Sequence, residues 1–280
     1  MKRFIFIIIL FIFCLSGSKI VCQDFCFAEA DEVVSIPILM YHSVLPGKTG
    51  NYSVTPDMLE EDIKFLQKHG YQSIFVKDII SFCEGDGTLP DKPVLLSFDD
   101  GHYNNYHYAY PILKKYNFKA NLNVIGAFSQ FSTSSGDSDH PEYSYLTWDE
   151  IKTLHESGLF EIGNHTYKMH DYSPRFGISK KKGEDEESYK NALSADIKKL
   201  EDYLSTKCGI TAEVFAYPFG EYNDDGEKIL RQMGYKAFLT CNEGINNVKK
   251  GDSKVLSHLK RINRTGKLSS KEFFEKYGID

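Results

Sequence analysis

Short hydrophobic runs alternate with amphipathic segments along most of this 280-residue chain. Runs of this length are typical of buried strands, and apolar residues spaced along one helical face indicate helices between them. Strands that alternate with helices form parallel sheets, because each helix returns the chain to the end of the sheet where the next strand begins. The predicted strands are residues 36–41, 71–75, 93–98, 120–125, 160–163, 213–217 and 235–240. The predicted helices are residues 55–69, 76–82, 106–116, 147–156, a long segment ending near residue 206, and residues 224–233.

About seven parallel strands in one sheet close, or nearly close, into a barrel. We therefore expect an α/β fold of this kind. Residues 129–142 and the charged run at 180–187 are expected to be surface loops, because they are rich in polar side chains and glycine. No Pro-, Gly- or Ser-rich linker divides the chain after its N-terminal segment, which predicts a single domain over residues 31–280.

The N-terminus has the pattern of an export signal. A basic start (MKR) precedes an apolar stretch over residues 4–15, which is too short to span a bilayer comfortably, and residues 28–30 (AEA) match a cleavage site. We expect a signal peptide over residues 1–30, a mature chain that begins near Asp31, and a secreted or surface-associated protein. Retention as an uncleaved membrane anchor is the alternative.

Composition limits the possible partners and disulfides of the protein. The net charge of −6 disfavours a nucleic-acid partner. Only Cys83, Cys208 and Cys241 follow the predicted cleavage site, so the exported protein would form at most one disulfide, for which Cys208 and Cys241 are the candidate pair.

Two adjacent carboxylates, Asp99 and Asp100, directly follow the predicted strand at 93–98. Each disfavours ionisation of the other unless a nearby positive charge compensates, and a bound cation is the simplest compensation. The carboxyl end of a parallel strand is also where α/β enzymes place their chemistry. The pair therefore predicts a metal ligand beside a general base.

His165 follows another predicted strand end, and His170 lies five residues later. Two imidazoles and one carboxylate form an open site for Zn²⁺ or a related divalent ion, with room for water and substrate. A spacing of five is not one helical face, so a turn must bring the two rings together. His102 and His107 are expected to be a loop residue and a helix-face residue outside the site.

Three segments resemble the signature motifs of the polysaccharide deacetylases, the family 4 carbohydrate esterases with a NodB-homology domain. Residues 97–101 (SFDDG) resemble the first motif, residues 165–170 (HTYKMH) the second, and residues 215–220 (FAYPFG) the third. The resemblance extends from residue 36 to about residue 264 and implies a distorted (β/α)7-type barrel.

The departures from the family pattern point to one branch. The two histidines are five residues apart where most of the family has four, Ala216 stands where the family has an orienting arginine, and His258 is followed by Leu259 where the family has aspartate. In all three departures the chain resembles one branch of the family, the poly-β-1,6-N-acetylglucosamine de-N-acetylases. That branch also begins with the equivalent of residues 38–42 (ILMYH), which implies His42 rather than His258 as the general acid.

The resemblance implies a role for each site residue. Asp99 would be the general base, and the backbone N–H of Phe219 would face the oxyanion. Arg261 is a candidate for the missing orienting arginine, and a surface arginine is the alternative interpretation. The residues that would hold the divalent metal, Zn²⁺ foremost with Co, Ni or Fe as alternatives, are Asp100, His165 and His170.

The implied reaction is removal of N-acetyl groups from N-acetylglucosamine units of an extracellular polysaccharide. Tyr103, Tyr167 and Tyr217 are candidate substrate contacts, because aromatic faces stack on sugar rings, and core packing is the alternative. A peptidoglycan N-deacetylase and an acetylxylan esterase are alternatives with the same site. A carbohydrate-binding protein without turnover is an alternative from another class. It would require loss of the base or of a metal ligand, but Asp99, Asp100, His165 and His170 are all present.

Overall fold

The computed structural model describes residues 33–136 and 138–280. The predicted signal peptide and the cleavage point at Asp31 lie outside the described residues. Within the described part of the chain, no helix is both long and apolar enough to cross a membrane.

A parallel sheet forms the centre of the fold, as predicted. Its strands lie in the order β10-β9-β8-β7-β6-β2-β12, every neighbouring pair is parallel, and β5 pairs with β6 beside this path. All six residues of β6 are buried, which is typical of a strand covered on both faces. The strands are β2 (Ile38–Tyr41), β5 (Gln72–Ser73), β6 (Pro93–Phe98), β7 (Ala120–Val124), β8 (Phe160–Asn164), β9 (Val214–Ala216), β10 (Ala237–Leu239) and β12 (Ile262–Asn263).

The segment before β12 joins the two edges of this curled sheet. The Leu259 amide donates to the carbonyl of Phe238 in β10 at 2.9 Å, and three residues later Ile262 pairs with Leu39 in β2. An isolated bridge between Leu239 and Leu259, rather than a full ladder, therefore connects β10 to the segment before β12, which makes the barrel distorted. This confirms the predicted (β/α)7-type fold.

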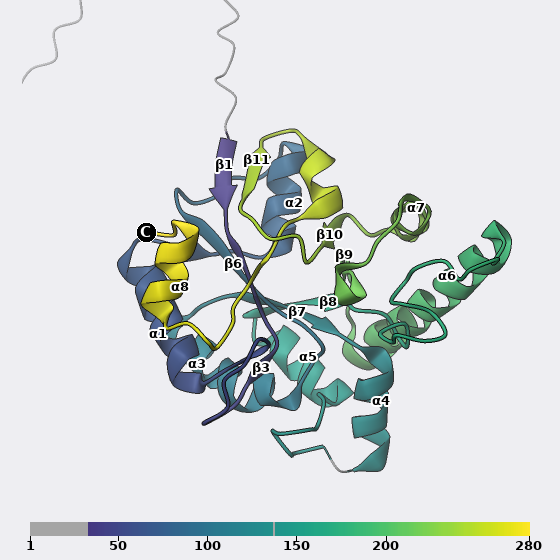
Figure 1. The fold of residues 1–280 in the computed structure, drawn as a ribbon, viewed down its shortest axis with the longest axis horizontal. Helices are drawn as coiled ribbons and strands as arrows, with labels where there is room; N and C mark the ends of the chain where they lie inside the picture. Colours follow the sequence, from purple (N-terminus) through teal and green to yellow (C-terminus); the bar gives the residue numbers. More distant parts are fainter. Residues whose placement is uncertain (1–32, 137) are drawn as a thin grey trace, which may run out of the picture. The chain divides into compact units, whose positions relative to one another are not determined.

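The helices follow the strands and flank the sheet (Figure 1). In Figure 1, α1, α3 and α8 lie beside one another, and Phe65 of α1 stacks on Phe274 of α8 with ring centroids 4.4 Å apart. The helices are α1 (Pro56–Lys68), α2 (Val76–Glu84), α3 (Tyr110–Tyr116) after the π-helical turn η1 (Asn105–Ala109), α4 (Gly126–Ser135), α5 (Trp148–Glu156), α6 (Glu186–Tyr203) continuing into η2 (Leu204–Cys208), α7 (Asp224–Gln232) and α8 (Ser270–Tyr277).

Local signals explain where several helices begin. The Thr55 side chain accepts the Met58 amide at the start of α1, and Thr147 and Glu150 form a capping box at the start of α5. Helix α2 is capped from a distance, because the side chain of Glu161 in β8 accepts the amides of its first two residues at 2.7 and 3.0 Å.

One expected loop was wrong, and one open question about the cysteines is answered. Residues 129–135 belong to α4 rather than to a loop, because the hydroxyls of Ser132 and Thr133 accept the amides of Tyr145 and Trp148 and so hold the following loop against the helix. The cysteine pair does not form, since Cys83, Cys208 and Cys241 are all free thiols.

Several short elements had no prediction. They are the antiparallel pair β1 (Val33–Ile36) and β11 (Asn246–Lys249), the pair β3 (Ser43–Val44) and β4 (Ser53–Val54), the 3₁₀ turns η3 (Pro218–Gly220) and η4 (Ser253–His258), and the last strand and helix.

Candidate active site

A cavity of about 540 Å³ opens at the carboxyl ends of the sheet strands. His42 follows β2, Asp99 follows β6, His165 follows β8 and Tyr217 follows β9, so parallel strand direction alone gathers these side chains at one end of the barrel. The sequence-predicted site residues that line the cavity are His42, Asp99, Asp100, His165, His170, Tyr217 and Phe219.

Asp100, His165 and His170 converge within this cavity. Asp100 Oδ1 lies 3.6 Å from His165 Nε2 and 3.5 Å from His170 Nε2, and one ligand atom from each of the three lies within 4.8 Å of the other two. This carboxylate oxygen is buried and accepts no hydrogen bond. Such an orphaned oxygen between two imidazoles fits a divalent cation.

The protonation state of His165 suits a metal ligand. Its Nδ1–H donates to the Ala216 carbonyl at 2.7 Å, which leaves the Nε2 lone pair facing Asp100. Burial lowers the pKa of His165 to about 4, so the ring is neutral at pH 7.

Backbone strain is concentrated around this cluster. Four non-glycine residues of the described chain have φ values in the left-handed region, and three belong to the site: Asp100 at 72°, Thr166 at 71° and Phe219 at 59°. Each such residue costs about 1–3 kcal/mol, which the surrounding structure must offset. The turn at Thr166, whose hydroxyl accepts the Met169 amide at 3.0 Å, brings His170 back to His165 across the five-residue spacing.

Asp99 lies beside this cluster in a buried hydrogen-bond network. Its Oδ1 accepts hydrogen bonds from Arg261 and from Asn123, both at 2.8 Å. Burial alone would raise the pKa of Asp99, but the Arg261 guanidinium together with the neighbouring His165 and His42 outweighs burial, and the pKa falls to about 2. Arg261 also donates to the Ser97 hydroxyl and the Thr240 carbonyl, so the buried guanidinium has a fixed orientation. Arg261 is therefore a buried partner of Asp99 and not a surface side chain.

His42 lies in the same cavity. Its Nδ1 is buried without a hydrogen-bond partner, and its ring centroid lies 4.9 Å from that of Tyr52. Burial lowers the pKa of His42. His258 lies elsewhere, 3.5 Å from Glu227 of α7, and does not line the cavity.

The structure places one of the three candidate tyrosines at the cavity. Tyr217 lines the cavity, but Tyr103 is buried outside it, and Tyr167 stacks on Tyr203 with centroids 5.8 Å apart. The paths of the loops decide which aromatic side chains reach the site.

Other aromatic residues, which the sequence analysis missed, form the wall of the cavity. Tyr172 and Phe176 are 74% and 41% exposed, and both stack on Phe219, with centroids 4.6 and 4.9 Å from its ring. Tyr52, 61% exposed, lines the cavity beside His42. The sequence signal that could have identified the wall is the aromatic pair Tyr172 and Phe176, which are four residues apart in a polar segment just after His170.

His102 was also assigned wrongly. Its Nε2 lies 3.3 Å from Asp100 Oδ2 and its side chain lines the cavity, whereas His107 is exposed as expected. The cause is the turn after β6, where Asp100 and Gly101 both have φ values of 72° and return the chain onto the carboxylate.

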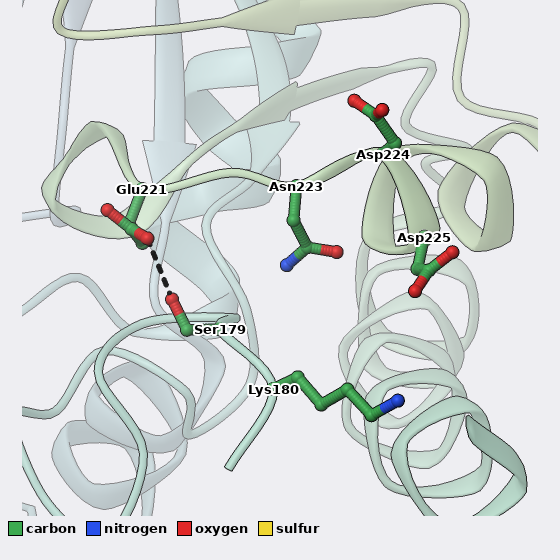
Figure 2. Close-up of a pocket in the computed structure, with 6 residues that line it drawn as sticks. All are labelled: Ser179, Lys180, Glu221, Asn223, Asp224 and Asp225. Carbon is green, nitrogen blue, oxygen red and sulfur yellow. Dashed lines mark hydrogen bonds between the residues drawn. The ribbon is translucent and has the colours of Figure 1, made fainter. Parts of the chain in front are cut away.

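A second hollow lies at the start of α7 (Figure 2). Three of its polar side chains already bond to protein partners, because Ser179 donates to Glu221 at 3.0 Å and the Asn223 side chain caps α7 by accepting the Gly226 amide. Among the described residues, no histidine lines this hollow, whereas His42, His102, His165 and His170 all line the barrel cavity.

Fold and site together define an α/β-barrel protein with a His-His-Asp cluster at the carboxyl ends of its strands. A sequence model described as polysaccharide deacetylase matches residues 86–238, and the chain belongs to the polysaccharide deacetylase family. YxkH of Bacillus subtilis (strain 168), which carries a polysaccharide deacetylase name, is 31% identical over 216 residues, which are 77% of this chain and 68% of that protein.

Two further proteins, one compared by sequence and one by structure, are similar to this chain. The poly-β-1,6-N-acetyl-D-glucosamine N-deacetylase of Escherichia coli (strain K12) is 27% identical over 72% of this chain, but this chain spans only about a third of that protein, 33%. The solved structure of Streptococcus pyogenes deacetylase PplD in complex with acetate has a TM-score of 0.69 and 26% identity, covering 87% of this chain and 98% of that one.

Proposed function

We propose that this protein is an exported, metal-dependent hydrolase that removes N-acetyl groups from N-acetylglucosamine units of an extracellular polysaccharide of the poly-β-1,6-linked type. The observation that carries the proposal is the meeting of Asp100, His165 and His170 with the Asp99–Arg261 pair in one open cavity. The names of the relatives support the choice of polymer.

In this proposal Asp100, His165 and His170 hold a divalent cation, Zn²⁺ foremost. When bound, such an ion lowers the pKa of a water ligand and polarises the acetyl carbonyl. The chain contributes a site that is ready for it, since His165 is fixed as a neutral Nε2 ligand and Asp100 offers a buried oxygen without a competing donor.

Asp99 takes the proton from the attacking water. Because Arg261 keeps the carboxyl group ionised, Asp99 is available as a base over the whole physiological pH range. The hydrogen bonds from Arg261 and Asn123 both reach Oδ1, so Oδ2 is the oxygen that is left to accept the proton.

His42 gives a proton to the leaving amine. The side chain lines the same cavity, and burial lowers the pKa of its ring more than the neighbouring Asp99 and Asp100 raise it, so the protonated ring gives up its proton readily. The backbone N–H of Phe219 is the proposed donor to the oxyanion that develops on the acetyl oxygen.

A sugar polymer fits the surroundings of this centre. The stacked Tyr172, Phe176 and Phe219 rings offer apolar faces at the cavity wall, and sugar rings stack on such faces. Residues 1–30 are proposed to direct export and residues 31–280 to form the catalytic domain, which would bring the enzyme to an extracellular polymer.

The test is acetate release by the purified chain, supplied with Zn²⁺, from β-1,6-linked N-acetylglucosamine oligomers, peptidoglycan strands and acetylated xylan. We expect release from the first substrate, none with Asp100→Ala, and little from the other two. Equal rates for the wild-type protein and Asp100→Ala would refute the proposed chemistry, and preference for another polymer would refute the proposed substrate.

A further inference from the structure

We propose that His102 is a positioning residue that holds Oδ2 of Asp100, so that Oδ1 remains the oxygen presented to the metal ion. The inference rests on the metal site of the proposed function and assigns a role to a side chain outside the three ligands.

The two oxygens of Asp100 have different surroundings. Oδ1 faces the Nε2 atoms of His165 and His170 at 3.6 and 3.5 Å and has no hydrogen-bond donor. Oδ2 lies 3.3 Å from His102 Nε2, close enough for a polar contact that needs only a small adjustment to become a hydrogen bond from an N–H donor. His102 therefore selects which oxygen is free, and a carboxylate that would otherwise rotate about its last bond is held in one orientation.

The His102 ring is itself held in place by Tyr145. The backbone of His102 forms an antiparallel bridge with Tyr145, and the two rings stack with centroids 5.0 Å apart and an interplanar angle of 23°. Tyr145 in turn lies against Phe128 of α4, with ring centroids 4.3 Å apart. The neighbouring amides are fixed as well, because Leu146 N–H donates to the Gly101 carbonyl at 2.9 Å.

The backbone after β6 makes this contact. Asp100 and Gly101 both have φ values of 72°, so the chain reverses at once and returns residue 102 to the carboxylate. A Cβ at position 101 would lie 3.2 Å from Val124 Cγ1, so the turn also packs closely on β7. Glycine meets both requirements, the left-handed conformation and the close approach.

His102 is a positioning residue rather than a fourth ligand. The group of side chains whose ligand atoms all approach one another within 4.8 Å consists of Asp100, His165 and His170 and leaves His102 out. Groups that hydrogen-bond a ligating carboxylate typically change metal affinity by roughly 10–100-fold when they are removed.

The test compares Zn²⁺ affinity, measured by competition with a chromophoric chelator, for the metal-depleted full chain and its variants. His102→Ala should weaken Zn²⁺ binding by roughly 10–100-fold. His102→Gln should restore most of the affinity, because the glutamine amide can donate from a position similar to that of Nε2. His107→Ala, a change of an exposed histidine on the next turn, is the matched control and should bind as the wild type does.

Wild-type affinity in His102→Ala would overturn the inference, and so would a His102→Gln variant as weak as His102→Ala. Thermal unfolding of the metal-free proteins separates positioning from general stability, since only a structural role lowers the Tm of His102→Ala without metal. Failure of the proposed reaction is distinguishable: a wild-type protein that binds Zn²⁺ but releases no acetate would leave the positioning role supported by the affinities.

Discussion

Replacing Arg261 with methionine should destabilise the protein strongly and in a way that depends on Asp99. The guanidinium is fully buried and lies 2.8 Å from Asp99 Oδ1. Removing it leaves a buried carboxylate with Asn123 as its remaining hydrogen-bond donor. Breaking a buried ion pair from one side costs about 3–5 kcal/mol. For a domain of this size 1 kcal/mol changes the Tm by about 2–4 °C, so we expect a loss of roughly 6–20 °C.

A double-mutant cycle measures the dependence. Arg261→Met, Asp99→Asn and the double variant are unfolded in urea at pH 7 with a chelator present, so that metal binding does not contribute. Because the double variant buries no unpaired charge, its loss should be smaller than the sum of the single losses by more than about 1 kcal/mol. Arg264→Met is the control, since Arg264 pairs with Asp62 through bonds of 2.7 and 3.0 Å and should show no coupling to Asp99→Asn.

The reasoning fails if Arg261→Met and Asp99→Asn are additive within about 0.5 kcal/mol, because the two side chains would then not interact in solution. It also fails if Arg264→Met couples to Asp99→Asn as strongly as Arg261→Met does. Acetate release gives a second reading: Arg261→Met should lose activity even at temperatures where it remains folded.

Further predictions concern the metal, the support of the base, pH and the substrate. A chelator should abolish acetate release and added Zn²⁺ restore it; activity that survives complete metal removal, measured by elemental analysis, would contradict the proposed site. Gly163→Ala should cost about 1–3 kcal/mol in urea unfolding and reduce activity, because the new Cβ would lie 2.1 Å from Asn123 Oδ1. Burial outweighs the helix amides and raises the pKa of Glu161 to about 7, from 4.5 when unfolded, so the folded state binds this proton more tightly. The stability of the wild type relative to Glu161→Gln should therefore fall by up to about 3 kcal/mol as pH rises from 4.5 through 7, and a flat difference in urea titrations would refute this. Tyr172→Ala and Phe176→Ala should each raise KM for sugar oligomers by roughly 2–10-fold and leave hydrolysis of a small acetyl ester unchanged, whereas equal losses on both substrates would exclude a sugar-stacking role.

The part of the site that the sequence could predict depends on strand direction. His42, Asp99 and His165 each follow a hydrophobic run, and parallel strands bring those positions to one end of a barrel whatever the details of the loops. Position relative to a strand end is local information, which a sequence pattern carries. The location of the site is therefore predictable from the sequence without any distance.

The contacts that a sequence could not predict depend on backbone turns and loop paths. The left-handed φ at Asp100, which brings His102 onto the carboxylate, has no sequence signal beyond the glycine that follows. The serines of α4 resemble a loop because serine is a weak helix former, and their hydroxyls find amide partners only in the folded chain. Tyr103 and Tyr172 are equally aromatic in sequence, and the folded loops alone decide that Tyr172 reaches the cavity.

The last strand shows why the end of the chain matters to a site formed mostly by earlier strands. β12 has two residues, too few for any periodic pattern, yet buried arginines flank it on both sides. Arg261 reaches forward to Asp99 at the cavity, while Arg264 forms a two-pronged pair with Asp62 of α1, which also accepts a hydrogen bond from Tyr41 of β2. An unpaired buried arginine is costly, so each of the two pairs stabilises the position of β12 beside β2. Arg261 is held at Asp99 by the same short strand that completes the sheet, so a change that displaces β12 should weaken catalysis although it touches no residue of the cavity.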